Sequence, residues 1–561
     1  MSVRGPGLLT VLALAVPGLV GAAPPELTHL LPSGTTRGTE QSVVLRGSFS
    51  GGDQRRTWAS HPGLLLTPGK KQSEVKVVVK ETVLPGRYWV RLANAEGASA
   101  LRPFFVSGVP EVSEKEPNNS VREAQKLDGE RHVVNGVLGK TGDVDTFAIF
   151  LKKGQSVVAA MAANGPLGSP MDGLLQVVTP RGFVVAQNDD ASGLDPLVAW
   201  TARRDGACLV RAFAFPSKTN SSIRLAGGDN FIYRLTLTSG PFIDYSMPLA
   251  VSREKPSTVA LFGWNLEEPS KQRQVNLAEP GDRLVSRTRD RLVVFDPRWG
   301  NTLSVKQVDH AVAVEKEPNS REVPQQIKIP VTICGRIGEA KDLDVFEFEA
   351  KKGQPLQLVV ESRRLGFPLD PVLRVTGATG KVIQETETRS ADKIDESLTW
   401  TPPADGRFRV EVGDLFQHGG ARYAYRLTIA PVKARATVTV EKDRWELVGE
   451  KPQEIKLTIA RSGGYSQSIR FEAVELPPGV EAAPVVSEPK GDSAKSVTLK
   501  LTKKADAGND GGGPLRIVGR VEGVKDAVVT TAAIEGLQER TPHLWLTFKP
   551  AAKKDKKKDK K

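Results

Sequence analysis

Two short stretches of this sequence, EKEPNN at residues 114–119 and EKEPNS at residues 315–320, decide how its fold is predicted. Their flanks repeat as well: GDVDTFAIFLKKGQ (142–155) matches KDLDVFEFEAKKGQ (341–354), and YRLTLTSGP (233–241) matches YRLTIAPVK (425–433). The matches follow the same order and are separated by small insertions only. A repeat of this length predicts a duplicated domain, and each EKEPN segment marks the entrance to one copy.

Strand patterns dominate both the repeats and the segments around them. Apolar and polar residues alternate in VKVVVKETV, LQLVVESRR and FRVEVGD, and turn signals such as KKGQ and PADG follow at short intervals. Helical spacing is hard to find, and SVREAQKL (120–127) is the best candidate for one or two turns. The sequence therefore predicts an all-β chain of several domains.

The N-terminus has the pattern of an export signal. Arg4 precedes an apolar run from Leu8 to Val20, and small residues follow it. This order is typical of a secretory signal peptide, and no later segment has the roughly 20 apolar residues of a membrane span. We expect a mature chain without a transmembrane segment that is secreted, periplasmic or at the cell surface.

The formal net charge of +13 comes in part from the C-terminal tail AAKKDKKKDKK (551–561). The rest of the chain is only mildly basic, so no specific nucleic-acid partner is expected. The tail is predicted to be disordered. It is either a solubilising terminus or an electrostatic tether that binds anionic surfaces. The two cysteines, Cys208 and Cys334, fall in different copies, and we expect buried free thiols.

The repeated unit resembles a known family. EPNN followed by GDVDTF, KKGQ, a DG turn and YRLT is similar to the bacterial pre-peptidase C-terminal (PPC) domain, a jelly-roll-like β-sandwich found in secreted proteins. The segments ahead of each copy more faintly resemble immunoglobulin-like (IPT/TIG-like) domains. The predicted order is a signal peptide (1–23), an Ig-like domain (24–110), a first PPC-like sandwich (111–240), a small Ig-like domain (241–311), a second PPC-like sandwich (312–432), a C-terminal Ig-like sandwich (433–550) and a Lys-rich tail (551–561).

The functionally best understood relative of the PPC domain is the collagen-binding domain of bacterial collagenases, where an acidic segment and an aspartate loop coordinate calcium. The resemblance implies a calcium site in each copy. In the first copy the matching residues are Glu114, Glu116, Asn118, Asn119 and Asp145, with Asp143 as a nearby candidate. In the second copy they are Glu315, Glu317, Asn319 and Asp344, with Asp342 nearby and Ser320 departing from the pattern. The relative has an aspartate where this chain has Gly142 and Lys341, so its two-calcium arrangement is not implied here.

The residues themselves also offer a physical reason for a cation at this place. In an extended EKE segment Glu114 and Glu116 point the same way, and Asp143 and Asp145 share a face if GDVDTF is a strand with Val144 turned inward. Two carboxylate pairs brought together repel each other unless a cation lies between them. The alternative is a solvated edge, with the asparagines that follow capping a short helix.

Nothing in the sequence predicts catalysis. The six histidines are scattered singly, and HExxH, GxSxG, Walker and dinucleotide-binding motifs are absent. Trp200 and Trp400 occupy equivalent positions and are predicted to lie in the cores, while Trp58, in a basic loop-like stretch, is the candidate for an exposed stacking platform.

The predicted protein is therefore a non-catalytic binding or scaffolding protein of the cell envelope or extracellular space. By resemblance, its calcium-stiffened sandwiches would engage an extracellular polymer, either a fibrous protein or a polysaccharide, or another envelope component. Two alternatives belong to another class: an accessory subunit of a secreted peptidase, or a cryptic hydrolase. A structural spacer without a ligand is the third.

Overall fold

The structure is a computed structural model, and it describes residues 23–49, 55–218, 224–255, 258–266, 273–277, 284–288, 290–386, 395–504 and 511–550. Almost all regular structure in these residues is strand, which confirms the predicted all-β class. None of the few short helices among them is long or apolar enough to cross a membrane. The predicted cleavage region up to residue 22 and the Lys-rich tail lie outside the described residues.

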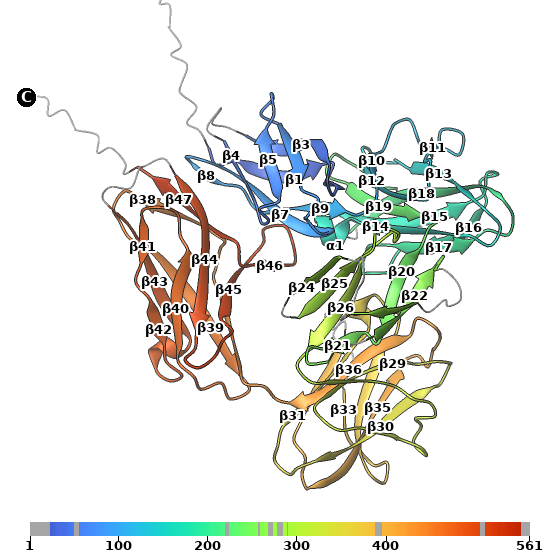
Figure 1. Cartoon of the computed structure of the whole chain (residues 1–561), viewed down its shortest axis with the longest axis vertical. Coiled ribbons are helices and arrows are strands. Elements are labelled where there is room, and N and C mark those ends of the chain that lie inside the picture. The colour runs from blue at the N-terminus through green and yellow to red at the C-terminus, as the bar shows by residue number, and fades with distance from the viewer. Residues whose placement is uncertain are drawn as a thin grey trace, which may run out of the picture.

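Strands β1 to β9 form the first sandwich (Figure 1). One sheet has the order β1 (Glu26–Leu31), β3 (Glu40–Ser48), β6 (Glu74–Val79) and β5 (Leu64–Pro68). The other has the order β2 (Gly34–Thr36), β9 (Arg102–Ser107), β7 (Gly86–Asn94) and β4 (Arg56–Ala59), with β8 (Gly97–Ala98) paired to β7. The alternating residues of these strands form one core that includes Leu27, Val43, Val77 and Phe104.

The second sandwich contains two five-stranded sheets. The first sheet runs β10 (Glu111–Ser113), β12 (Arg131–Val137), β19 (Ile232–Thr238), β14 (Ser156–Ala162) and β17 (Leu197–Thr201). The second runs β11 (Gln125–Lys126), β13 (Asp145–Leu151), β18 (Gly206–Pro216), β15 (Met171–Val178) and β16 (Val184–Asn188). The short helix α1 (Asn164–Leu167) follows β14.

The fourth sandwich repeats this topology strand for strand. Its sheets are β27 (Ala311–Val314), β29 (Val331–Arg336), β36 (Ala424–Pro431), β31 (Leu356–Glu361) and β34 (Glu396–Trp400), and β28 (Gln325–Gln326), β30 (Leu343–Ala350), β35 (Gly406–Asp414), β32 (Pro371–Gly377) and β33 (Val382–Glu385). The register agrees as well, because Leu151 pairs with Gly206 and Ala350 pairs with Gly406. The repeated sequences thus fold with one strand order and one register.

The third and fifth sandwiches complete the chain. The third contains β20 (Phe242–Met247), β22 (Thr258–Trp264) and β23 (Arg273–Asn276) against β21 (Ala250–Ser252), β26 (Leu303–Val308), β25 (Arg291–Phe295) and β24 (Leu284–Arg287). The fifth has β37 (Arg435–Thr439), β38 (Arg444–Val448), β39 (Gln453–Ser462), β40 (Ile469–Glu475), β41 (Val480–Ala482), β42 (Val485–Ser487), β43 (Ser496–Lys503), β44 (Gly512–Arg520), β45 (Val528–Ala533), β46 (Arg540–Thr541) and β47 (Leu544–Lys549).

The fifth sandwich folds back onto the first, and Figure 1 shows the β46 hairpin reaching toward it. The Arg91 guanidinium donates to the Asp443 carboxylate, and both side chains are buried. Arg87 binds Glu539 through two hydrogen bonds of 2.7 and 2.5 Å. Trp58 packs on the same interface, 5.2 Å from the His543 ring, so its prediction as an exposed platform is wrong.

The structure confirms the predictions for the cysteines and tryptophans of the repeated sandwiches but not the expected helix. Cys208 and Cys334 are buried free thiols, as expected. Trp400 lies in the core of the fourth sandwich, and Trp200 packs partly buried against the core of the second. The SVREAQKL segment forms a turn followed by β11 instead of a helix, so the alternative that Asn118 and Asn119 cap a helix there is wrong.

Candidate metal centre

Two clusters of carboxylates lie at equivalent places in the second and fourth sandwiches. We call Glu116, Asp143 and Asp145 the first acidic cluster, and Glu317, Asp342 and Asp344 the second acidic cluster. In each cluster one ligand atom per residue lies within 4.8 Å of the others, which is close enough to hold a metal ion. Residues from EKEPN and GDVD or KDLD therefore meet, as the sequence predicted.

The entrance segment bends at the first acidic cluster instead of continuing as a straight strand. β10 ends at Ser113, the chain bends at Glu116, and the Glu116–Pro117 peptide bond is cis. Oε2 of Glu116 accepts hydrogen bonds from the Asn118 backbone N–H (2.9 Å) and from Nδ2 of Asn119 (3.2 Å). The amide nitrogen of Asn119 thus helps to fix the Glu116 carboxylate.

The two aspartates of the first acidic cluster are both buried, although Val144 between them is half-exposed, contrary to the prediction that it turns inward. Oδ2 of Asp143 accepts the Gly139 N–H at 2.6 Å, and Oδ2 of Asp145 accepts the Tyr233 hydroxyl at 2.5 Å. Oδ1 of each is buried without a hydrogen-bond partner among the described residues. Buried carboxylate oxygens are costly when unpaired, and a bound cation would satisfy both.

Asn118 is tied to this cluster by its backbone N–H, which donates to Oε2 of Glu116. Its side chain is completely buried, and neither Oδ1 nor Nδ2 has a hydrogen-bond partner within the described part of the chain. Its backbone carbonyl accepts the Thr146 N–H at 2.9 Å, which ties the entrance segment to the start of β13. An amide oxygen is a normal ligand for a hard cation, so Asn118 Oδ1 is a fourth candidate donor.

Glu114 lies behind the cluster and not within it. Its Oε1 accepts the Val137 N–H at 2.8 Å, and its Oε2 lies 3.3 Å from the Tyr233 hydroxyl, which donates to it. Burial raises the pKa of Glu114 to about 10 and that of Asp145 to about 6. A hydrogen bond between the two carboxyls further raises the pKa of Glu114 and lowers that of Asp145. Burial next to these two groups also raises the pKa of Tyr233 well above its ordinary value, so the phenol stays a donor.

The second acidic cluster repeats this arrangement with fewer unpartnered atoms. The Tyr425 hydroxyl donates to Oδ2 of Asp344 at 2.5 Å, and Oδ1 of Asp344 is buried without a partner among the residues described. Oδ2 of Asp342 accepts the Gly338 N–H at 2.7 Å, and Nδ2 of the buried Asn319 is also unpartnered there.

The remaining residues of the second entrance segment have other partners. Glu315 accepts the Arg336 N–H at 2.7 Å and corresponds to Glu114, and burial raises the pKa of Glu315 and of Asp344. Ser320 donates its hydroxyl to Glu322 at 2.7 Å, so it does not add a ligand to the cluster. The first copy is therefore the better-equipped site.

Sequence reasoning missed the two tyrosines. Tyr233 and Tyr425 lie on β19 and β36, in the sheet opposite the aspartates to which they donate. The signal was present in the repeated YRLT motif, because a buried tyrosine hydroxyl needs a polar partner. The motif did not reveal which partner it finds.

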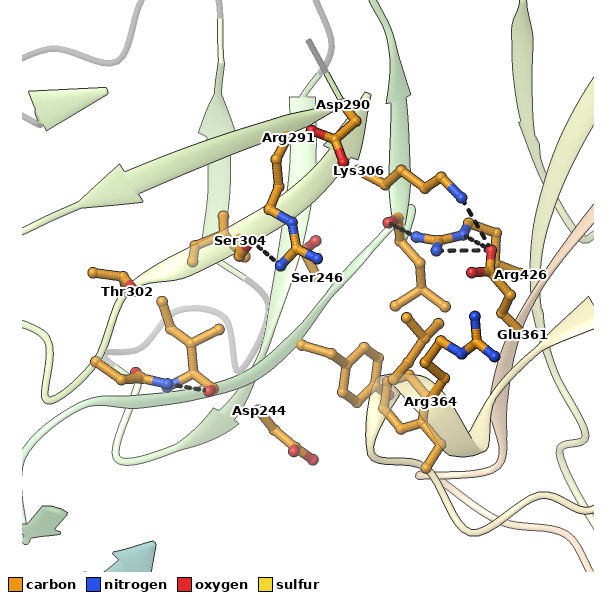
Figure 2. A pocket seen from close by; sticks show the side chains of 17 residues that line it. Asp244, Ser246, Asp290, Arg291, Thr302, Ser304, Lys306, Glu361, Arg364 and Arg426 are labelled. Atoms are coloured by element: carbon orange, nitrogen blue, oxygen red, sulfur yellow. Dashed lines mark hydrogen bonds and ion pairs between the residues drawn. The ribbon is translucent and has the colours of Figure 1, made fainter. Parts of the chain in front are cut away.

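A cavity of about 360 Å³ lies at the joint of the third and fourth sandwiches, and Figure 2 shows its charged side chains. Glu361 accepts hydrogen bonds from Arg426 at 2.8 Å and from Lys306 at 3.2 Å, and Arg426 also donates to the Leu249 carbonyl. Burial opposes ionisation of Glu361, yet these two cations hold its pKa below the ordinary value. Glu361 is thus bound by two cations, and the residues that line the cavity join the third sandwich to the fourth.

Comparison with known proteins gives limited matches. No protein-family model matches the chain. A probable subtilase-type serine protease of Deinococcus radiodurans is 30% identical over 155 residues, which is 27% of this chain and 20% of the protease. The chain thus spans about a fifth of the length of this curated relative.

Among solved structures, the chain is similar to the pre-peptidase C-terminal domain of a Bacillus anthracis collagenase. That match has 13% identity and a TM-score of 0.15, and covers 19% of this chain and 92% of that domain. Fibronectin(III)-like modules of Clostridium thermocellum CbhA match with 15% identity and a TM-score of 0.13, covering 36% of this chain and 88% of theirs.

Proposed function

We propose that this chain is an exported, non-catalytic binding protein of the cell envelope or extracellular space. In this proposal the second and fourth sandwiches are PPC-type domains that hold calcium and engage an extracellular polymer. The domain limits 24–110, 111–240, 241–311, 312–432 and 433–550 are part of the proposal.

The observation that carries the proposal is the first acidic cluster with its unpartnered buried oxygens. Glu116, Asp143, Asp145 and Asn118 offer oxygen atoms only, and oxygen is the donor that calcium and magnesium prefer. Calcium suits the site better because it accepts irregular geometry and carboxylates from separate segments.

Calcium at this place would stiffen one particular sheet. Asp145 is the first residue of β13, and the Asn118 carbonyl binds the Thr146 N–H on the same strand. A cation shared by Asp145 and Glu116 would fasten the entrance segment to the end of β13. The sheet β11-β13-β18-β15-β16 would then be held, at the start of β13, in the conformation that a ligand meets.

The outer side of this sheet is the proposed polymer-binding face. Phe150 on β13, Phe183 next to β16 and Phe215 on β18 are 62%, 67% and 37% exposed. Exposed aromatic side chains are enriched at binding sites, because they offer a large apolar area with few rotatable bonds. Three such residues on one sheet favour an extended ligand over a small molecule in a pocket.

The test measures retention of the mature full-length chain on immobilised collagens and polysaccharides, in calcium and in EDTA. We expect calcium-dependent retention on at least one polymer, lost in a Phe150→Ser/Phe183→Ser variant. Leu65→Ser is the control, because Leu65 is an apolar side chain that is 45% exposed but lies on β5 of the first sandwich, which holds neither acidic cluster. Retention on none of the polymers, or equal retention by both variants, would refute the polymer-binding proposal.

An accessory role for a secreted peptidase is the second candidate, and the sequence match to a subtilase-type protease favours it. It predicts that the chain copurifies with a secreted protease and changes that protease's activity on casein or collagen. Hydrolysis of these substrates by the pure chain would instead identify a hydrolase and overturn the non-catalytic assignment.

A further inference from the structure

A groove of about 950 Å³ opens at one end of the fourth sandwich, away from the second acidic cluster. It lies between the segment after β28, the end of β30 and the start of β35. Apolar side chains line it, namely Ile327, Ile329, Phe348 and Ala350. Charged side chains of both signs complete the lining: Lys328, Glu349, Lys351, Asp405 and Arg407.

The residues that line this groove differ from those at the equivalent positions of the second sandwich. The Leu127 N–H donates to the Ala148 carbonyl, and the Ile327 N–H donates to the Glu347 carbonyl, so the two segments are in equivalent positions. The strand position of Ala350 is filled in the second sandwich by Leu151, which is fully buried. In the fourth sandwich Ala350 instead lines the groove, next to Phe348, which stands where the second sandwich has Ile149.

The charge of the rim has also changed between the copies. Lys328 stands where the second sandwich has Asp128, because each residue directly follows the equivalent Leu127 or Ile327. Arg407 lies 4.0 Å from Glu349, and Asp405 accepts the Lys352 N–H at 2.6 Å, so these charges have partners. Lys328 and Lys351 make no ion pair with any described residue.

We propose that this groove binds an amphiphilic anion: a single aliphatic chain that carries a carboxylate or sulfate. The chain would lie on Ile327, Ile329 and Ala350, where burial of methylene groups is favourable. The anionic group would lie between Lys328 and Lys351, the two cations that lack a partner of their own. This site is independent of the acidic clusters and does not require calcium.

The experiment titrates the mature full-length chain with laurate below its micelle concentration, followed by isothermal titration calorimetry. We expect one saturable site, with affinity at least tenfold weaker for Ala350→Leu, which restores the leucine of the second sandwich. Lys328→Glu tests the head-group contact and should weaken binding at least threefold. Because Lys328 is exposed, this variant keeps the fold even if Ala350→Leu perturbs it, and thermal unfolding of both variants checks this.

Dodecyltrimethylammonium, with the same chain length and the opposite charge, is the matched probe. We expect it to bind at least tenfold more weakly than laurate, and Lys328→Glu should reduce that difference. Equal affinity for both probes, or wild-type laurate affinity in both variants, would show non-specific detergent binding and would overturn the proposal.

Discussion

The hydroxyl of Tyr233 donates a hydrogen bond of 2.5 Å to Oδ2 of Asp145, and this bond joins the two sheets of the second sandwich. It occupies one carboxylate oxygen and leaves Oδ1 buried and unpartnered among the described residues. Tyr425 makes the same bond to Asp344. In each copy a tyrosine thus orients an aspartate toward the acidic cluster, which is what a metal ligand requires.

The first prediction concerns this orientation. Tyr233→Phe removes the hydrogen bond but keeps the ring, so the Asp145 carboxylate can rotate away from the cation. We expect calcium affinity at the first cluster to fall about 10- to 100-fold, the usual effect of losing a residue that orients a ligand. Calorimetric titration measures it, and Tyr425→Phe serves as the control that should affect only the second cluster. Unchanged affinity in Tyr233→Phe would show that Asp145 is not positioned by this bond.

The Asn118 side chain should lower the stability of the calcium-free protein and contribute to calcium binding. Its buried amide lacks hydrogen-bond partners in the described residues, so Asn118→Leu removes an unsatisfied group from the calcium-free protein. We expect this variant to unfold in EDTA at the wild-type temperature or above it, but to lose most of the calcium-induced rise. Asn119→Ala, which loses only a bond to Glu116, should retain more of that rise. A variant that is destabilised in EDTA and still responds fully to calcium would refute a ligand role for Asn118.

The calcium effect should depend on pH. Burial raises the pKa of Glu114 and Asp145 above their ordinary values of 4.5 and 3.8, so without calcium the folded protein binds more protons than the unfolded chain does. Stability in EDTA therefore falls as pH rises from about 4 toward neutrality. Calcium replaces the proton on Asp145, whose pKa is raised to about 6, so the rise in unfolding temperature caused by calcium should be small at pH 5 and larger at pH 7.5. A calcium effect that is the same at both pH values would show that Asp145 is not coupled to the site.

The contact between the first and fifth sandwiches should depend on Arg91. Arg91 and Asp443 are both buried, and Arg91→Ala removes one of the two arginines that bind the Asp443 carboxylate, the other being Arg444. This should weaken the contact by roughly 1.5–3 kcal/mol. Small-angle scattering should then show a larger radius of gyration. Lys76→Ala, which breaks an exposed pair with Glu40 on the same sandwich, should leave the radius unchanged. Equal radii for wild type and Arg91→Ala would contradict a closed arrangement held by this pair.

The sequence predicted the parts of the site that lie close together in the chain. EKEPN and GDVD are local motifs, and their repetition indicated that Glu116, Asp143 and Asp145 belong to one feature. The same reasoning placed Glu114 and Asn119 among the ligands, because it could not show that Val137 and Glu116 bind them instead. A local sequence pattern shows which residues are near each other along a strand. It does not show which other groups form hydrogen bonds with their side chains.

Contacts between sheets and between sandwiches could not be predicted from the sequence. Tyr233 reaches Asp145 across the core, and Trp58 meets His543 from the far end of the chain. Both contacts depend on how separate sheets pack, which periodicity does not encode. Alternation predicts strands but not their neighbours, so the strand order was predictable only as far as the jelly-roll-like sandwich that the family resemblance implied.

The most direct test of the account is thermal unfolding of the full-length chain in EDTA and in millimolar calcium. We predict a calcium-induced rise of several degrees that Asp145→Asn reduces, that Asp344→Asn reduces less, and that the double variant abolishes. Superimposable curves in EDTA and calcium would mean that the acidic clusters hold no calcium, and the proposed function would lose its basis.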